Sequence, residues 1–73
     1  MALTHDLDAA ETAAYRLNNY IRAAGINGTG SVEELDEGYR LRATVYEPSE
    51  DDMIVLRRVP RVDGIDVRIL IIR

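Results

Sequence analysis

The 73-residue chain contains no cysteine, tryptophan, phenylalanine or lysine. Without cysteine it can form neither disulfide bonds nor thiolate metal sites, and its single histidine, His5, gives no basis for a zinc cluster. A chain this short buries only about 60% of the surface that its unfolded form exposes, so such domains commonly need a further source of stability. Oligomerisation remains as that source. The sequence predicts no metal and no cofactor.

Long hydrophobic segments are also absent. No segment approaches the roughly 18 apolar residues of a membrane span. The first residues, Met1–Asp6, have neither the positive region nor the apolar region of a signal peptide. These features predict a cytoplasmic protein with no membrane span.

Positive charge is scarce and comes only from arginine. The net charge is −4, which argues against a dedicated nucleic-acid binder, because phosphate contacts need a basic surface. Residues 1–39 hold seven acids and two arginines (−5), whereas residues 40–73 hold six acids and seven arginines (+1). The second half of the chain is therefore the place to look for a basic surface.

The first part of the chain has the pattern of an amphipathic helix. Apolar residues recur there at spacings of three and four, which is the periodicity of one helix face: Leu7, Ala10, Ala14, Leu17, Ile21 and Ala24. Thr4 or Asp6 is a suitable N-cap, and Gly25 is placed to end the helix. We expect Asn27–Ser31, which follows, to be a loop.

A β-hairpin is expected next, with Val32–Leu35 and Tyr39–Glu47 as its strands and Gly38 in the tight turn. Alternate residues of Tyr39–Glu47 are apolar, the pattern of a strand with one buried face. In either of two registers, Glu33 or Glu34 can lie opposite an arginine, Arg40 or Arg42.

A second helix follows the hairpin. Ser49 is the predicted N-cap, and the helix is expected to run from about Glu50 to Arg58, with Met53, Leu56 and Val59 facing inward. Pro60 ends it, Arg61–Gly64 turns the chain, and Ile65–Arg73 forms the last strand.

The sequence thus predicts one small α+β domain over residues 1–73, in the order α-β-β-α-β, with two helices packed on one face of a three-stranded sheet. The last strand is apolar on both faces. Val67, Ile69 and Ile71 point one way, toward the expected core, and Leu70 and Ile72 point the other. A domain of this size covers both faces of a sheet only rarely, so a partner is expected on the second face.

The predicted partner interface is the outer sheet face: Arg40, Arg42, Thr44, Tyr46, Arg68, Leu70 and Ile72. Arginine, tyrosine and aliphatic residues together are typical of protein interfaces, but the arginine stems could instead simply cover Leu70 and Ile72. We expect a non-catalytic module that forms a homo-oligomer, such as a dimer, or binds a protein partner. Two copies could stack their sheets, or pair strands if Val67–Ile72 lies at a sheet edge. The alternative is a small nucleic-acid-binding regulator that uses the arginines of this face.

Other motifs carry less weight. Gly25–Gly30 is glycine-rich, but it follows a helix and precedes a strand, the reverse of a phosphate-binding loop. The acids Glu50–Asp52 suit the start of a helix better than a calcium site, because they lack the spacing of a calcium-binding loop. One histidine and no cysteine give no triad or comparable catalytic set, so the chain is not predicted to be an enzyme.

From Val32 onward the chain resembles a BON domain, a small module of bacterial envelope and stress proteins. The resemblance rests on the turn at Asp36–Gly38, on Leu41–Val45, and on Ser49 and Glu50 at a helix start. It also rests on the end of that helix and the entry to the last strand, at Val59, Val62–Ile65 and Val67. The chain departs from the family pattern at Ala43, where glycine is usual, and at Pro60. The resemblance implies an α-β-β-α-β fold over residues 10–73 and a non-enzymatic binding module. Phospholipid binding, commonly proposed for that family, is not carried over, because this acidic chain is poorly suited to anionic lipids.

Overall fold

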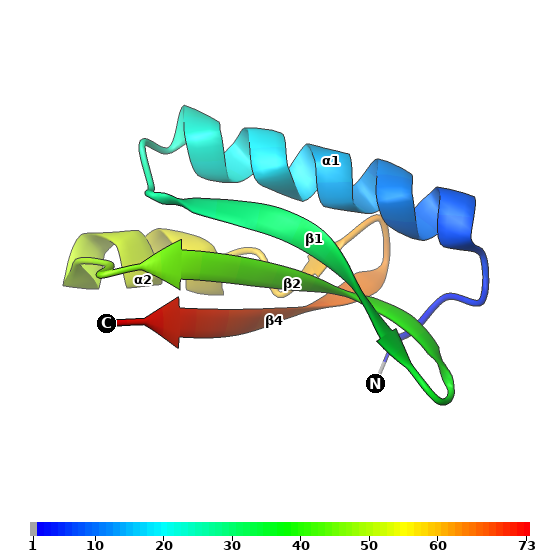
Figure 1. Cartoon of the computed structure of the whole chain (residues 1–73). Helices are drawn as coiled ribbons and strands as arrows, with labels where there is room; N and C mark the ends of the chain where they lie inside the picture. The colour runs from blue at the N-terminus through cyan, green and yellow to red at the C-terminus, as the bar shows by residue number, and fades with distance from the viewer. Residues whose placement is uncertain (1) are drawn as a thin grey trace.

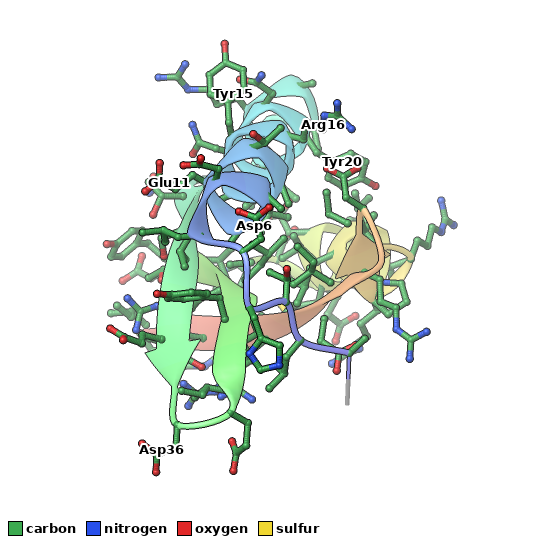
Figure 2. All side chains as sticks on the ribbon, turned by 90° about the vertical axis from the view of Figure 1, so that its right-hand side faces the viewer. Asp6, Glu11, Tyr15, Arg16, Tyr20 and Asp36 are labelled. Carbon is green, nitrogen blue, oxygen red and sulfur yellow. The ribbon has the colours of Figure 1, made fainter. Side chains whose placement is uncertain are left out.

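The computed structural model describes residues 2–73 (Figure 1). Its elements are α1 (Leu7–Ala23), β1 (Gly28–Leu35), β2 (Gly38–Tyr46), α2 (Glu50–Arg57), β3 (Arg61–Val62) and β4 (Ile65–Ile72). The sheet has the strand order β1-β2-β4-β3, in which β2 and β4 are parallel and the other neighbours are antiparallel. The sheet curves around the two helices (Figure 2), whose buried side chains belong to one core.

The prediction of three strands in the order α-β-β-α-β is wrong. Arg61 and Val62, expected in a turn, form the short strand β3, which pairs with Asp66 and Ile65 of β4. Between them, Asp63 and Gly64 have φ angles of 54° and 79°, as in the type I′ turn that closes two-residue hairpins. The order is therefore α-β-β-α-β-β in a four-stranded mixed sheet.

Helix α1 begins and ends as its sequence predicts. The Asp6 carboxylate accepts hydrogen bonds from the Asp8 and Ala9 amides, and Gly25 follows the C-cap with a φ of 72°. The buried residues are Ala10, Ala13, Ala14, Leu17 and Ile21. The expected stripe was too long at both ends, because Leu7 is 44% exposed and Ala24 is exposed.

Strand β1 is longer than predicted, since it begins at Gly28 and not at Val32. The expected loop at residues 27–31 is wrong for residues 28–31, which pair with β2 from Arg42 to Val45. Helix α1 lies close against this stretch. A Cβ atom at Gly30 would lie 2.8 Å from the Asn18 amide nitrogen and 2.9 Å from Leu17 Cγ. Glycine at position 30 allows this close helix–strand contact, whereas Gly25, in the same glycine-rich segment, ends α1.

Helix α2 has the predicted N-cap. Ser49 and Asp52 form a capping box, in which each side chain accepts a hydrogen bond from the other residue's amide. Met53 and Leu56 are buried, as expected, and Val59 is half-buried beyond the helix end.

Strand β4 places its alternate residues as predicted but buries fewer of them. Val67 and Ile69 are half-buried and pack against the core. Ile71 was expected to close the core, yet its side chain is 37% exposed. Its side chain lines a groove between the end of β4 and α2.

Candidate interaction surface

The outer face of the sheet is set by the alternation of residues along β2 and β4. Leu41, Ala43 and Val45 are fully buried against the helices, so the residues between them point to the opposite side. In the parallel register Arg42 pairs with Arg68 and Tyr46 with Ile72. All the predicted interface residues therefore share one face, which we call the outer face: Arg40, Arg42, Thr44, Tyr46, Arg68, Leu70 and Ile72.

A single carboxylate, that of Glu33 on β1, lies at the centre of the arginines. Arg40 donates from Nε to Glu33 Oε1, and Arg68 donates from an Nη atom to Glu33 Oε2 at 3.1 Å. Arg42 forms an ion pair with the same Oε2 at 3.6 Å. The Glu33 side chain is only 13% exposed. This arginine cluster joins three adjacent strands of the sheet through one acidic residue.

The electrostatics of the cluster follow from this sharing. Partial burial raises the pKa of Glu33, but hydrogen bonds and charge from Arg40 and Arg68 outweigh it and hold the pKa below its ordinary value. Three arginines with one carboxylate leave a charge of +2, whereas the whole chain carries −4 and the rest of the molecule therefore −6. The molecule thus carries a basic patch at the arginine cluster, and its remaining charges sum to −6.

Arg42 is the least satisfied member of the cluster. Its Nε atom is buried and has no hydrogen-bond partner within residues 2–73. An unpaired buried donor costs free energy, so a carboxylate from outside that drew this side chain toward it would relieve a cost. The Arg42 side chain is also 38% exposed and accessible to such a ligand.

The other half of the outer face is apolar. Tyr46 is 43% exposed and Ile72 is 42% exposed, and they are neighbours on β2 and β4. Leu70 and Thr44, the next pair along the strands, are half-buried. The arginine stems therefore do not cover Ile72. The outer face consists of a basic half at Arg40, Arg42 and Arg68 and an apolar half beside it.

Sequence reasoning placed the arginines correctly but missed the role of Glu33. It offered Glu33 or Glu34 as a partner for one arginine, and the register puts Glu33 opposite Arg40 and Glu34 opposite Tyr39. Closing the hairpin directly over Asp36 and Glu37 would have given this register. The contact with Arg68 depends on the parallel pairing of β4, which no local pattern reports.

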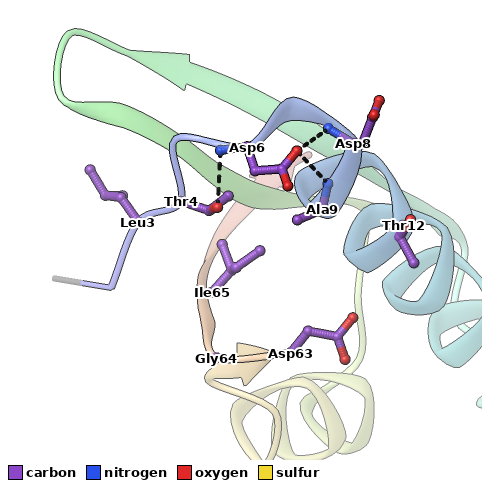
Figure 3. A pocket seen from close by; sticks show the side chains of 9 residues that line it. All are labelled: Leu3, Thr4, Asp6, Asp8, Ala9, Thr12, Asp63, Gly64 and Ile65. Carbon is purple, nitrogen blue, oxygen red and sulfur yellow. Dashed lines mark hydrogen bonds between the residues drawn. The ribbon is translucent and has the colours of Figure 1, made fainter.

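A separate pocket of about 510 Å³ lies at the N-terminus of α1, and three of its lining residues are aspartates (Figure 3). Each of two carboxylates already has a partner: Asp6 caps α1, and Asp63 accepts from Arg16 at 2.7 Å. Across residues 2–73, no group of three or more His, Asp or Glu side chains is arranged to hold a metal ion. The pocket is explained by helix capping and one surface ion pair.

Comparisons with known proteins yielded no match among protein-family models, curated proteins or solved structures. The resemblance to a BON domain therefore stays a prediction. Neither helix within residues 2–73 is long and apolar enough to cross a membrane.

Proposed function

We propose that this protein is a non-catalytic interaction module whose outer face binds an acidic, partly apolar segment of a protein partner. The observation that carries the proposal is the composition of that face: an arginine cluster with a charge of +2 beside Tyr46 and Ile72, both more than 40% exposed. Both helices lie on the opposite side of the sheet, so neither competes for this surface.

The two halves of the face favour different parts of one ligand. Carboxylates pair with arginine in a planar, two-pronged geometry that fixes orientation. The aromatic ring of Tyr46 and the side chain of Ile72 offer area that gains free energy when it is removed from water. A segment with acidic residues at one end and apolar residues at the other matches both halves.

The negative charge outside the arginine cluster bears on the choice of partner. Polyanionic nucleic acid would be repelled by the charge of −6 outside the cluster at all but short range. A short acidic segment of a protein can contact the basic patch alone. The protein ligand is therefore favoured over the nucleic acid.

The test measures binding of a labelled synthetic peptide in which a run of glutamates is followed by a run of leucines by fluorescence anisotropy, with single-stranded oligothymidine as the nucleic-acid probe. Arg42→Glu should weaken peptide binding about tenfold, or about 1.4 kcal/mol, and binding should weaken with salt. Arg22→Glu, an exposed arginine on α1, is the matched control and should bind as the wild type does.

Equal affinity of the Arg42→Glu and Arg22→Glu variants, or no peptide binding at low salt, would contradict the proposal. Binding of oligothymidine without binding of the peptide would instead favour the nucleic-acid-binding alternative.

A further inference from the structure

Strand β4 is flanked on one side by β2 along most of its length, but β3 flanks it on the other side only at Ile65 and Asp66. Residues 67–72 therefore have no neighbouring strand on the side away from β2, within the part of the chain that the structure describes. Figure 1 shows this side of β4 as the lower margin of the sheet. We call it the open edge. The last strand is thus an inner strand at its start and an edge strand thereafter.

Hydrogen bonds on either side of β4 reveal which peptide groups point to the open edge. The Ile72 carbonyl accepts from the Glu47 amide at 2.8 Å, toward β2, whereas the Val67 amide donates to the Pro60 carbonyl at 3.0 Å, toward β3. Peptide groups alternate in direction along a strand. Those of Ile69 and Ile71 are in phase with Val67 and point outward from the sheet.

Pro60 explains why β3 goes no further along β4. An antiparallel neighbour opposite Val67 would normally return a hydrogen bond to the Val67 carbonyl. Proline has no N–H to donate, so the ladder stops after one bond. The outward carbonyl of Val67 and both backbone groups of Ile69 and Ile71 are left as a template for another strand.

The opposite edge of the sheet, at β1, is partly covered by α1. There the Gly30 amide points outward and donates to Asn18 Oδ1 of α1 at 3.2 Å, and α1 packs close against it. At the open edge, Ile69–Ile72 contains no charge, proline or bulge, the devices that protect exposed edges in monomers. Four consecutive aliphatic residues on an unprotected edge are a favourable template for pairing with another strand.

We propose that a second copy of this chain pairs with the open edge, β4 antiparallel to β4, about a two-fold axis at Leu70. The inference goes beyond the proposed function, because it uses the edge of the sheet and leaves most of the outer face accessible. The two sheets join into one, and the two arginine clusters lie on the same side of it.

The phase of the peptide groups restricts the register. Outward-pointing residues must oppose each other, and Ile69 opposite Ile71 of the second copy forms four hydrogen bonds by symmetry. Leu70 then faces Leu70 of the second copy, and Arg68 lies beside Ile72 of the second copy. A register with Ile69 opposite itself would put Ile71 of the second copy opposite Val67, where Pro60 already lies.

Charge and apolar area both suit a second copy as the occupant. The two-fold axis runs the two α2 helices antiparallel, so the acidic first turn of one, with Glu50 and Asp51, approaches the basic last turn of the other, with Arg57. Ile54 and Ile71, 48% and 37% exposed, line the groove of about 540 Å³ between α2 and the end of β4. Pairing along the open edge would place both side chains near the second copy.

The first test is sedimentation equilibrium of the full chain with Ile71→Pro and its control, Ile71→Val. Proline removes an N–H that no bond within the chain uses, and the extended residue before it suits proline. The wild type and Ile71→Val should be dimers, whereas Ile71→Pro should be a monomer with an unchanged circular dichroism spectrum. A monomeric wild type, or dimers in all three, would overturn the proposal; the latter would favour stacking of the sheets.

A second test does not depend on how proline is tolerated. The chain has no cysteine, so a single one reports contacts between copies without ambiguity. Leu70→Cys would place two thiols about 4.5 Å apart at Cα, within the range of a disulfide, and should cross-link readily on mild oxidation. Ile72→Cys, on the same face and more exposed, should cross-link far more slowly. Faster cross-linking at position 72 than at 70 would refute the register.

These tests separate the dimer from the proposed function. A monomeric Ile71→Pro variant that still binds the glutamate–leucine peptide would support both the dimer and the proposed function. If Arg42→Glu is a dimer that no longer binds the peptide, that result supports the proposed function and does not bear on the dimer.

Discussion

Neutralising Glu33 should destabilise the fold more than any other single loss of an acidic charge. The Glu33→Gln variant keeps the shape of the side chain but removes the charge that holds three arginines together. The contact with Arg40 is the strongest, because both side chains are mostly buried, with 13% and 22% exposed. Arg42 and Arg68 are 38% and 47% exposed, so solvent screens their contributions.

The magnitude follows from these exposures. A hydrogen bond to a charged group contributes about 1.5–3 kcal/mol when it is shielded, and an exposed ion pair contributes about 0–1 kcal/mol. The glutamine oxygen still accepts one bond, so we expect a net loss of about 2 kcal/mol. For a domain of this size, that loss lowers the melting temperature by about 8–16 °C.

Salt and pH give the prediction a distinct signature. Added salt should raise the melting temperature of Glu33→Gln, because it screens the repulsion among the arginines, and should lower that of the wild type. The pKa of Glu33 is lower in the folded chain than its ordinary value of 4.5. The stability that the Glu33 charge contributes is therefore complete above pH 4.5 and is lost as the pH falls through the folded pKa. The Glu33→Gln variant has no such charge, so its stability should fall less between neutral and acid pH.

Thermal unfolding followed by circular dichroism tests the reasoning. Glu34→Gln is the matched control, because Glu34 is the neighbouring residue, is exposed, and pairs with Tyr39 and not with an arginine. If both variants melt at the same temperature and respond alike to salt, the arginine cluster does not contribute to stability as described.

Two further substitutions test the backbone. Gly30→Ala should cost about 1–3 kcal/mol, because the added Cβ would lie 2.8 Å from the Asn18 amide nitrogen and force α1 away from β1; chemical denaturation measures the loss, and an unchanged midpoint would disprove the close contact. Glu47→Gly should raise stability by up to about 1 kcal/mol, because Glu47 has a φ of 45° that glycine adopts without strain; a lower midpoint would contradict this.

Local patterns in the sequence predicted most of the elements but not all of their connections. The helix caps at Asp6 and Ser49 and the alternation along β2 depend on residues close in sequence, and they were predicted correctly. Strand β3 was missed although Asp63 and Gly64 form a typical two-residue hairpin turn. Val62 and Ile65, which pair across this turn, were assigned to different elements: Val62 to a turn and Ile65 to the last strand.

What the sequence could not supply were contacts across the sheet. Gly28–Ser31 is a strand because it pairs with β2 and because Gly30, which has no side chain, lets α1 pack closely against it. The exposure of Ile71 depends on where α2 begins relative to the end of β4. For the candidate site, the shared outer face of the predicted interface residues followed from alternation, whereas the joining of Arg40 and Arg68 through Glu33 required the strand order.

The position of Glu33 also bears on the order in which the chain folds. Its contact with Arg40 spans seven residues, and its contact with Arg68 spans 35. The hairpin of β1 and β2 closes over two residues, whereas β4 reaches β2 only after the intervening helix, so the loop entropy of the second step is larger. We therefore expect Glu33 and Arg40 to meet early, as part of the hairpin. The Glu33 carboxylate is then already in place to bind Arg68 when β4 joins the sheet. The charge of Glu33 on β1 therefore helps to set the register of β4.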